Sequence, residues 1–255
     1  MRVYPFLLAV AALLPVGLIA AQDQNKPAVV HMNDGGYDGP LQSIFVPPKA
    51  GAPFSLTLAT EWTRPLNNGG SFTLANERRI VRDSYGRIYQ ERWILVPKGG
   101  PYKSHMNVFQ ITDPELHRWY NCETATKVCE LLTYHLTTVD KYVPSMAING
   151  SIAKGMGTQV HQDLGTSSVE DVPTHGYRDT QTLNPGAMGN DAPMVTTREF
   201  WWSPDLGLNL ISIVDSPRFG KQVFRAKDIS TTPPDAGLFV VPDDYKVVDR
   251  RDTSD

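Results

Sequence analysis

The chain has no excess of basic residues. Its 255 residues include 24 Lys and Arg against 27 Asp and Glu, a formal net charge of −3. General nucleic-acid or anionic-membrane binders are expected to be basic. The interval 76–93 holds five arginines, but Glu77, Asp83 and Glu91 are interleaved with them, which is typical of a hairpin with charged pairs across its solvated face. No nucleic-acid partner is therefore expected.

Cysteine is scarce: the chain has two, Cys122 and Cys129. There is no Cys-x-x-Cys spacing and no second pair, which disfavours the alternative of half a metal or redox site. In an exported chain an even cysteine count favours a disulfide. If 119–121 and 128–132 form a hairpin, the two cysteines face each other with Cα atoms about 4.5–5.5 Å apart, within reach of a bridge. The sequence predicts a Cys122–Cys129 disulfide that clasps this hairpin.

The start of the chain predicts export. Arg2 precedes an uncharged stretch, 5–21, that ends in small residues, which is the layout of a secretory signal peptide. A membrane anchor is the alternative, but the stretch is at the short limit and contains Pro15 and Gly17. We expect residues 1–21 to be a signal peptide, the protein to be exported to the periplasm, and the mature chain to lack a transmembrane helix.

Motifs that bind phosphate or calcium are missing. In "NPGAMGNDAP" (184–193), Gly186 and Gly189 are not followed by the lysine and helix that a Walker-type loop requires. A calcium loop needs carboxylates at alternate positions, and Asp191 stands alone. Two successive pairs of turn-forming residues remain, so the interval is expected to connect two strands.

Catalytic motifs are missing as well. The six histidines are scattered, and a metal triple of His161, Asp163 and His175 is of a kind that arises often by chance in polar loops. We expect no metal, no cofactor and no catalytic residue, and therefore no enzyme.

Two carboxylates remain open to two interpretations. Glu199 and Asp215 lie in predicted strands and could pair as acid and base. Partnership across strands with Arg198 or Arg218 is the more ordinary role for such residues.

What the chain does have is alternation. "FSLTLATEW" (54–62) places Phe54, Leu56, Leu58 and Trp62 on one face, as in a half-buried strand. Further strands are predicted at 71–82, 87–96, 105–112, 116–122, 128–137, 175–183, 195–203, 207–214 and 222–229, separated by turn signals. No convincing amphipathic helix is present. The sequence predicts a mainly β domain over 53–249, built on a curved antiparallel sheet that forms an unclosed half-barrel.

Some strands are apolar on both faces. "REFWW" (198–202) and "LNLISIV" (208–214) both show this pattern. A sheet with one solvated face does not need it. The second face belongs either to a filled sandwich core or to an apolar cavity, and both alternatives stay open. If it is a cavity, Phe54, Leu56, Leu58 and Trp62 are the candidate ligand-binding residues.

Three intervals lack a strand pattern. Residues 22–52 are rich in Pro, Gly and Asp, and 144–166 in Gly, Ser and Thr. We expect a poorly ordered segment at 22–52, a mobile loop near 144–166 and a disordered tail at 250–255.

Several motifs carry a family resemblance. "VFQITDPELHRWY" (108–120) resembles a hairpin of the periplasmic outer-membrane lipoprotein carrier (LolA-like) superfamily. The closing "FRAKDISTTPPDAGLFVVPDDYKVV" (224–248) resembles the end of that superfamily. "PGAMGND" (185–191), "EFWWSPDLGL" (199–208) and "DSPRFGKQVFRAKDI" (215–229) are similar to a narrower set of exported bacterial proteins. The resemblance spans about residues 52–248, with the exception of a variable loop at 140–166.

The resemblance implies a strongly curved, unclosed antiparallel sheet with an apolar concave face that holds acyl chains. The carriers close this cavity with amphipathic helices, for which this chain offers few candidates. Two functions follow as hypotheses. The first is an exported, non-enzymatic binding protein for a lipid or another apolar ligand. The second is a structural or signalling module of the cell envelope that binds a partner protein.

Overall fold

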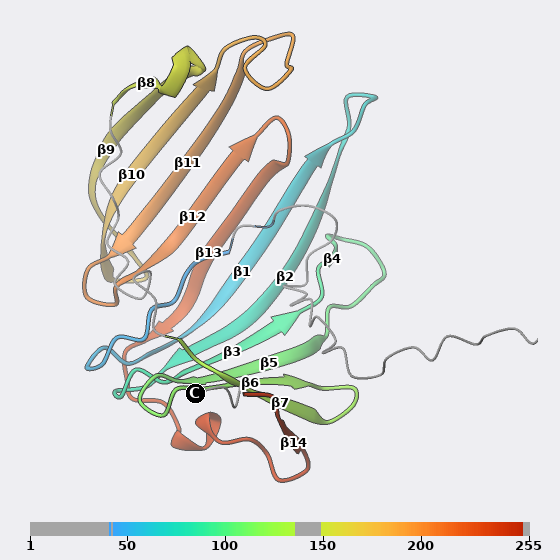
Figure 1. Cartoon of the computed structure of the whole chain (residues 1–255), viewed down its shortest axis with the longest axis vertical. Coiled ribbons are helices and arrows are strands. Elements are labelled where there is room, and N and C mark those ends of the chain that lie inside the picture. Colours follow the sequence, from blue (N-terminus) through green and yellow to red (C-terminus); the bar gives the residue numbers. More distant parts are fainter. Residues whose placement is uncertain (1–40, 42, 136–148, 252–255) are drawn as a thin grey trace, which may run out of the picture. The chain divides into compact units, whose positions relative to one another are not determined.

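A computed structural model of the chain describes residues 41, 43–135 and 149–251 (Figure 1). The expected signal peptide, 1–21, lies outside the described residues. So do 22–40 and 42 of the segment expected to be poorly ordered, 144–148 of the expected mobile loop, and the last four residues of the tail. Among the described residues, no helix is both long enough and apolar enough to span a membrane.

Strands are the dominant regular element of the described chain. In the first half these are β1 (Phe54–Pro65), β2 (Ser71–Arg82), β3 (Ile88–Trp93), β4 (Val96–Pro97), β5 (Met106–Asp113), β6 (Arg118–Glu123) and β7 (Val128–Thr133). In the second half they are β8 (Gly150–Ile152), β9 (Gly157–Val169), β10 (Val172–Leu183), β11 (Met194–Ser203), β12 (Leu208–Ser216), β13 (Gly220–Ser230) and β14 (Lys246–Asp249). Two short 3-10 helices accompany them, η2 (Ala153–Gly155) and η3 (Ala236–Phe239).

All of these strands belong to one 14-stranded sheet (Figure 1). Its order is β14-β7-β6-β5-β3-β2-β1-β13-β12-β11-β10-β9-β8, and β4 pairs with β2 beside this path. Neighbours are antiparallel, except that β14 runs parallel to β7. The sheet curves from β8 to β14, and these two end strands are not paired with each other. The predicted mainly β class and the unclosed curved sheet are confirmed.

The predicted strands correspond closely to ten of those observed. In β1 the buried and half-buried positions alternate from Phe54 to Trp62, because successive side chains of a strand point to opposite faces. β2 begins and ends at the predicted residues, 71 and 82. The structure adds β4, β8, β9 and β14. β8 and β9 lie within 144–166 or overlap it, where the sequence predicted a mobile loop.

The cysteine prediction is confirmed. Cys122 in β6 lies directly opposite Cys129 in β7, and their sulfur atoms form a disulfide. Both side chains are fully buried beside Phe109 and Phe239. The bridge therefore belongs to a hydrophobic cluster as well as to the hairpin.

The interval 184–193 connects β10 to β11 through turns, as predicted. Ala187 N–H donates to the Asn184 carbonyl oxygen at 3.2 Å, and Gly189 N–H donates to that of Gly186 at 3.3 Å. It holds no phosphate or calcium motif.

Candidate functional site

The four candidate ligand-binding residues share one face of β1. Phe54, Leu56, Leu58 and Trp62 are 0%, 2%, 0% and 1% exposed. Neighbouring strands extend this apolar surface through Ile80, Leu208, Leu210, Phe224 and Ala226. We call it the strap face, and the opposite face of the sheet the open face.

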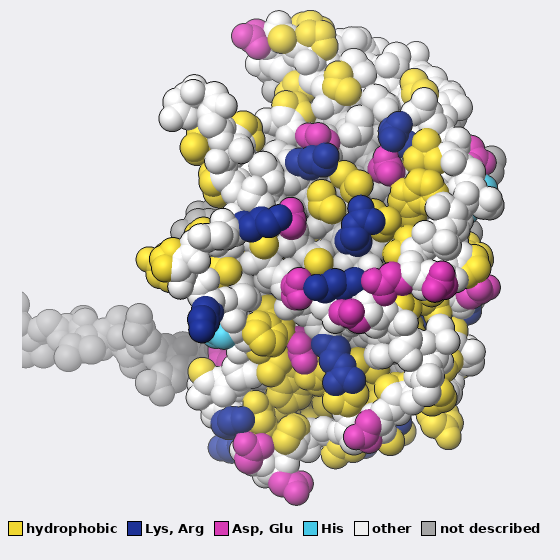
Figure 2. Space-filling model, turned by 180° about the vertical axis from the view of Figure 1, so that it is seen from behind, with side chains coloured by type: hydrophobic (Ala, Val, Ile, Leu, Met, Phe, Trp, Pro, Cys, Tyr) yellow, Lys and Arg dark blue, Asp and Glu magenta, His cyan; other side chains and the backbone are white. Residues whose placement is uncertain are grey.

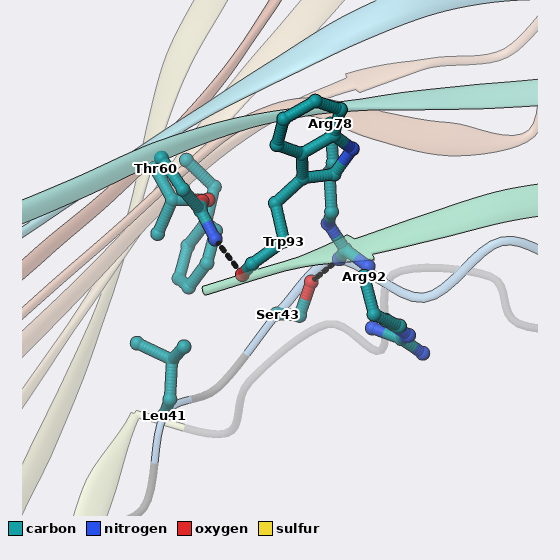
Figure 3. A pocket seen from close by; sticks show the side chains of 8 residues that line it. Leu41, Ser43, Thr60, Arg78, Arg92 and Trp93 are labelled. Carbon is teal, nitrogen blue, oxygen red and sulfur yellow. Dashed lines mark hydrogen bonds between the residues drawn. The ribbon is translucent and has the colours of Figure 1, made fainter. Parts of the chain in front are cut away.

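An irregular segment lies over the strap face. Residues 43–52, which we call the strap, contain no helix and no strand. Ile44 of the strap belongs to the same buried cluster as Phe54, Leu56 and Leu58, and Leu41 packs beside Trp62. A cavity of only about 10 Å³ remains beneath Leu41 and Ser43 (Figure 3). That volume has room for about one water molecule.

One arginine fastens the end of the strap that leads into β1. Arg82 is fully buried, and its guanidinium donates to the carbonyl oxygens of Pro47 (2.7 Å) and Ala52 (2.8 Å). The same guanidinium lies 4.8 Å from the ring centroid of Phe54. Burial lowers the pKa of Arg82 to about 10, so the side chain is charged at neutral pH. A buried charge is retained here because backbone dipoles and an aromatic face surround it.

The start of the strap is held differently. Arg78 donates a hydrogen bond to the Ser43 hydroxyl (Figure 3). Ile44 and Val46 pack against the apolar cluster of the sheet. Further along, Lys49 Nζ donates to the carbonyl oxygens of Pro204 and Asp205. Apolar packing therefore dominates at 43–46, whereas a buried charge holds 47–52.

These arginines correct one sequence prediction. The interval 76–93 was expected to carry its charges on a solvated face, but Arg78 and Arg82 point to the strap face and are 5% and 0% exposed. The predicted hairpin is present as β2 and β3, and in its turn Gly86 N–H donates to the Asp83 carbonyl oxygen. The signal for the buried pair was the alternation itself, because Arg78, Ile80 and Arg82 fall on one face of β2.

Beside the strap, the sheet opens into a fork. β2 pairs with β3 at Ile80–Arg82 and with β4 at Leu74 and Ala75. Within the described chain, residues 76–79 therefore lack a strand partner on that side. Side chains bridge the gap: Asn76 Nδ2 donates to the Trp93 carbonyl oxygen at 2.5 Å (Figure 3).

A cavity of about 600 Å³ occupies the fork on the open face. Glu91 organises its wall by accepting hydrogen bonds from Trp93 Nε1 (2.7 Å), Arg79 N–H (3.2 Å) and the Tyr89 hydroxyl (3.3 Å). Burial and the Glu91 carboxylate raise the pKa of Tyr89. Trp93 also lines the small cavity on the strap face, so both sides of the fork meet at this residue. No prediction from the sequence anticipated the fork.

A similar Glu-x-Trp arrangement recurs on the open face of β11. Trp201 Nε1 donates to Glu199 Oε1 at 3.0 Å, and Arg178 donates twice to Glu199 Oε2. Burial raises the pKa of Glu199, but Trp201 and Arg178 outweigh it and the net shift is downward. Glu199 thus has a cross-strand arginine partner of the expected kind, but it is Arg178 of β10 and not Arg198 or Arg218. Arg198, the neighbour of Glu199 in the same strand, lies on the other face. The sequence feature that could have predicted this arrangement is the Glu-x-Trp pattern, which occurs as "ERW" (91–93) and again as "EFW" (199–201).

The open face carries many paired charges. Lys98 Nζ lies 2.5 Å from Glu61 Oε1, and Lys227 Nζ lies 2.7 Å from Glu77 Oε1. Figure 2 shows Lys and Arg side chains beside Asp and Glu side chains across the middle of one face. Such pairing leaves little net charge to attract an ion.

The histidine triple is not assembled. His161 and His175 stack on either side of the Tyr177 ring, with centroids 5.5 Å and 4.7 Å away. Each is paired with its own carboxylate, His161 with Asp179 and His175 with Asp163. In the part of the chain that the structure describes, no group of three such residues could hold a metal.

Comparisons with known proteins add structural neighbours only. No family model and no curated protein sequence matches the chain. A conserved protein from Thermus thermophilus is 11% identical, with a TM-score of 0.41 over 78% of this chain and 91% of that one. MucB is 16% identical, with a TM-score of 0.39 over 79% of this chain and 61% of that one.

A Vibrio parahaemolyticus domain named for outer membrane lipoprotein sorting is also among the neighbours. It is 9% identical, with a TM-score of 0.18 over 73% of this chain and 88% of that one. Proteins of the kind suggested by the sequence resemblance are thus found among similar structures. At TM-scores below 0.5, neither ligand nor activity is transferred to this chain.

Proposed function

We propose that this protein is an exported, non-enzymatic binding protein for an apolar ligand such as an acyl chain, held on the strap face in place of residues 43–46. The observation that supports it is the cover of that face. A sheet normally buries an apolar face against a second layer of regular structure. Here Ile44 and Val46 do so from an irregular segment.

The strap is suited to partial release. Arg82 fixes 47–52 through a buried guanidinium, while 43–46 rely mainly on apolar packing and on the Ser43–Arg78 hydrogen bond. Lifting 43–46 exposes the apolar side chains around Leu56 and Leu58. An acyl chain restores their burial at about 0.8 kcal/mol per CH₂ group.

The strap also sets the affinity. The ligand can bind only those molecules in which the strap is displaced. Its apparent dissociation constant is therefore the intrinsic constant divided by the fraction of such molecules. A variant that weakens the strap should therefore bind more tightly, although no ligand contact has been added. A ligand site that did not involve the strap would not show this.

The experiment is titration of a fluorescent fatty acid into the wild type and three variants. Ile44→Ser weakens the strap and should increase the affinity several-fold. Leu56→Ala removes part of the wall and should lower it about tenfold. Leu116→Ser, in the exposed β5–β6 turn, is the control and should leave it unchanged. Circular dichroism confirms that each variant is folded.

The rival hypothesis is a cell-envelope module that binds a partner protein. Native mass spectrometry of protein purified from its own host separates the two. A co-purified lipid of stoichiometric amount supports the proposal. No bound lipid, together with no fatty-acid binding even by Ile44→Ser, contradicts it and leaves the partner-binding module.

A further inference from the structure

Four turns lie together at one end of the sheet. They connect β1 to β2, β8 to β9, β10 to β11 and β12 to β13, and they occupy the upper end of Figure 1. The register establishes this arrangement. Pro65 pairs with Ser71, Thr63 with Lys221, Thr197 with Asp215, and Leu183 with Gly157. We call these four turns and their adjoining strand ends the rim.

Exposed apolar side chains stand on the rim. Leu66 (43% exposed) and Phe72 (39%) flank the β1–β2 turn, and Met188 (56%) and Val195 (47%) occupy or adjoin the β10–β11 connection. Single exposed apolar residues are ordinary on protein surfaces. Their charge environment decides whether they form a binding surface.

Cations without carboxylate partners accompany them. Arg64, Lys154 and Arg218 have no carboxylate at salt-bridge distance within the described ranges. Arg64 instead lies 5.8 Å from the Phe72 ring centroid, and Arg218 lies 5.0 Å from that of Phe219. Asp191 is the acid within the four turns, and Asp215, near the end of β12, faces Lys221 across the β12–β13 pair. The two arginines therefore sit beside apolar surface with their charge available.

The other end of the sheet is acidic. Its turns connect β2 to β3, β5 to β6, β9 to β10 and β11 to β12, and they carry five acids: Asp83, Glu115, Glu170, Asp171 and Asp205. The cations there are Arg87 in the β2–β3 turn, and Lys49 and Arg82, which bind carbonyl oxygens of the β11–β12 turn. Tyr85 (71% exposed) and Leu116 (54%) lie in these acidic turns. Both ends of the sheet thus carry exposed apolar side chains, but the charges around them are mainly positive at the rim and mainly negative at the other end.

We propose that the rim docks onto the surface of an anionic lipid bilayer. Lipid phosphates attract unpaired Lys and Arg side chains, and apolar side chains beside them enter the interface between headgroups and acyl chains. The acidic end is repelled by the same surface and so faces away. The formal charge of −3 is a sum over the whole chain, so it does not show that one end of the sheet is basic and the other acidic.

This docking goes beyond the proposed ligand binding and is independent of it. The rim shares no residue with the strap or with Leu56 and Leu58. Fatty-acid titration without vesicles reports on the strap face, and vesicle binding without fatty acid reports on the rim. A negative result in one of these experiments therefore does not count against the proposal that the other experiment tests.

The test is co-sedimentation of the full mature protein with large vesicles. The probes are vesicles of phosphatidylcholine alone and of phosphatidylcholine with about a third phosphatidylglycerol, at low and at high salt. We expect binding to the anionic vesicles only, with loss at high salt because the attraction is screened. Lys154→Gln/Arg218→Gln should weaken it about tenfold or more. Leu66→Ser/Phe72→Ser should weaken it to a similar extent.

The matched control is Tyr85→Ser/Leu116→Ser, which removes exposed apolar side chains from the acidic end. It should leave vesicle binding unchanged. Should Phe72→Ser impair folding, the charge variant still decides, since both of its positions are exposed. Equal sedimentation with both vesicle types, or equal losses in the control and the rim variants, overturns the proposal. Absence of binding to the anionic vesicles does so too.

Discussion

Arg82 Nη2 donates a hydrogen bond of 2.6 Å to the carbonyl oxygen of Leu206, which lies 124 residues further along the chain. The same guanidinium binds the strap at Pro47 and Ala52. One buried side chain therefore joins β2, the strap and the β11–β12 turn. Water cannot replace these contacts at a fully buried site.

Replacing Arg82 should be costly. Arg82→Lys keeps the charge but loses the planar set of donors, so some of the carbonyl oxygens lose their partners. We expect the free energy of unfolding to fall by about 3 kcal/mol, measured by urea denaturation. Arg79→Lys is the control, because its side chain points to the open face of the same strand. Similar losses in both variants would show that Arg82 is not the fastening point.

The disulfide should contribute mainly to stability. Replacing both Cys122 and Cys129 with Ala should lower the free energy of unfolding by about 2–3 kcal/mol, because the unfolded chain regains the freedom of a short loop. Far-ultraviolet circular dichroism should remain that of a β protein. Peptide mass mapping without reduction should recover the bridged pair from the wild type, and finding both thiols free would contradict the assignment.

The sequence predicted the strands whose faces differ in polarity. β1 and β2 alternate clearly, and their bounds were close to those observed. β9 was missed because "GTQVHQDLGTSSV" is polar on both faces, so it carries no alternation. β14 was missed because its four residues pair in parallel with β7, a partner more than a hundred positions earlier. Local pattern cannot reveal such a pairing.

The candidate site was predicted in part. The shared face of Phe54, Leu56, Leu58 and Trp62 followed from periodicity. The strap did not, because an irregular segment has no period, and its place depends on backbone carbonyl groups that bind Arg82. The fork depends on the position at which β2 stops pairing with β3, and no local sequence motif indicates that position.

Glu199 should contribute to stability in a pH-dependent way. Its folded pKa is lowered on balance, because hydrogen bonds from Trp201 and Arg178 outweigh burial. A carboxylate with a lowered folded pKa stabilises the fold above its unfolded pKa of about 4.3. This contribution is lost as the pH falls through the folded pKa.

Melting temperatures between pH 7 and pH 3 provide the measurement. Glu199→Gln should be less stable than the wild type at pH 7, and the difference should shrink below about pH 4. Glu115→Gln, in an exposed turn, is the control. A difference that stays constant across this range would assign Glu199 a role independent of its charge.

Gly176 should not tolerate a side chain. A Cβ atom there would lie 2.7 Å from the Trp201 ring, which covers this position from β11. Gly176→Ala should therefore cost about 1–3 kcal/mol of unfolding free energy through overpacking. In a Trp201→Ala background the same change should cost much less, which a double-mutant cycle measures. Equal costs in both backgrounds would contradict this contact.

Leu58 tests how completely the strap covers the sheet. Its side chain is 0% exposed in the closed arrangement. Leu58→Ala should then cost about 2–5 kcal/mol, since a void remains and its packing contacts are lost. If residues 43–46 are displaced in much of the population, the leucine is partly unpacked already and the loss should be less than half as large.

The control is Leu66→Ala in the exposed turn after β1, which should change the free energy of unfolding by about 0.5 kcal/mol or less. Adding Ile44→Ser to Leu58→Ala refines the result, because the two side chains belong to one buried cluster. Their costs should be less than additive, since weakening the strap removes part of what Leu58 packs against. Strict additivity would mean that Ile44 and Leu58 are energetically independent, and the strap could then not be the cover that a ligand displaces.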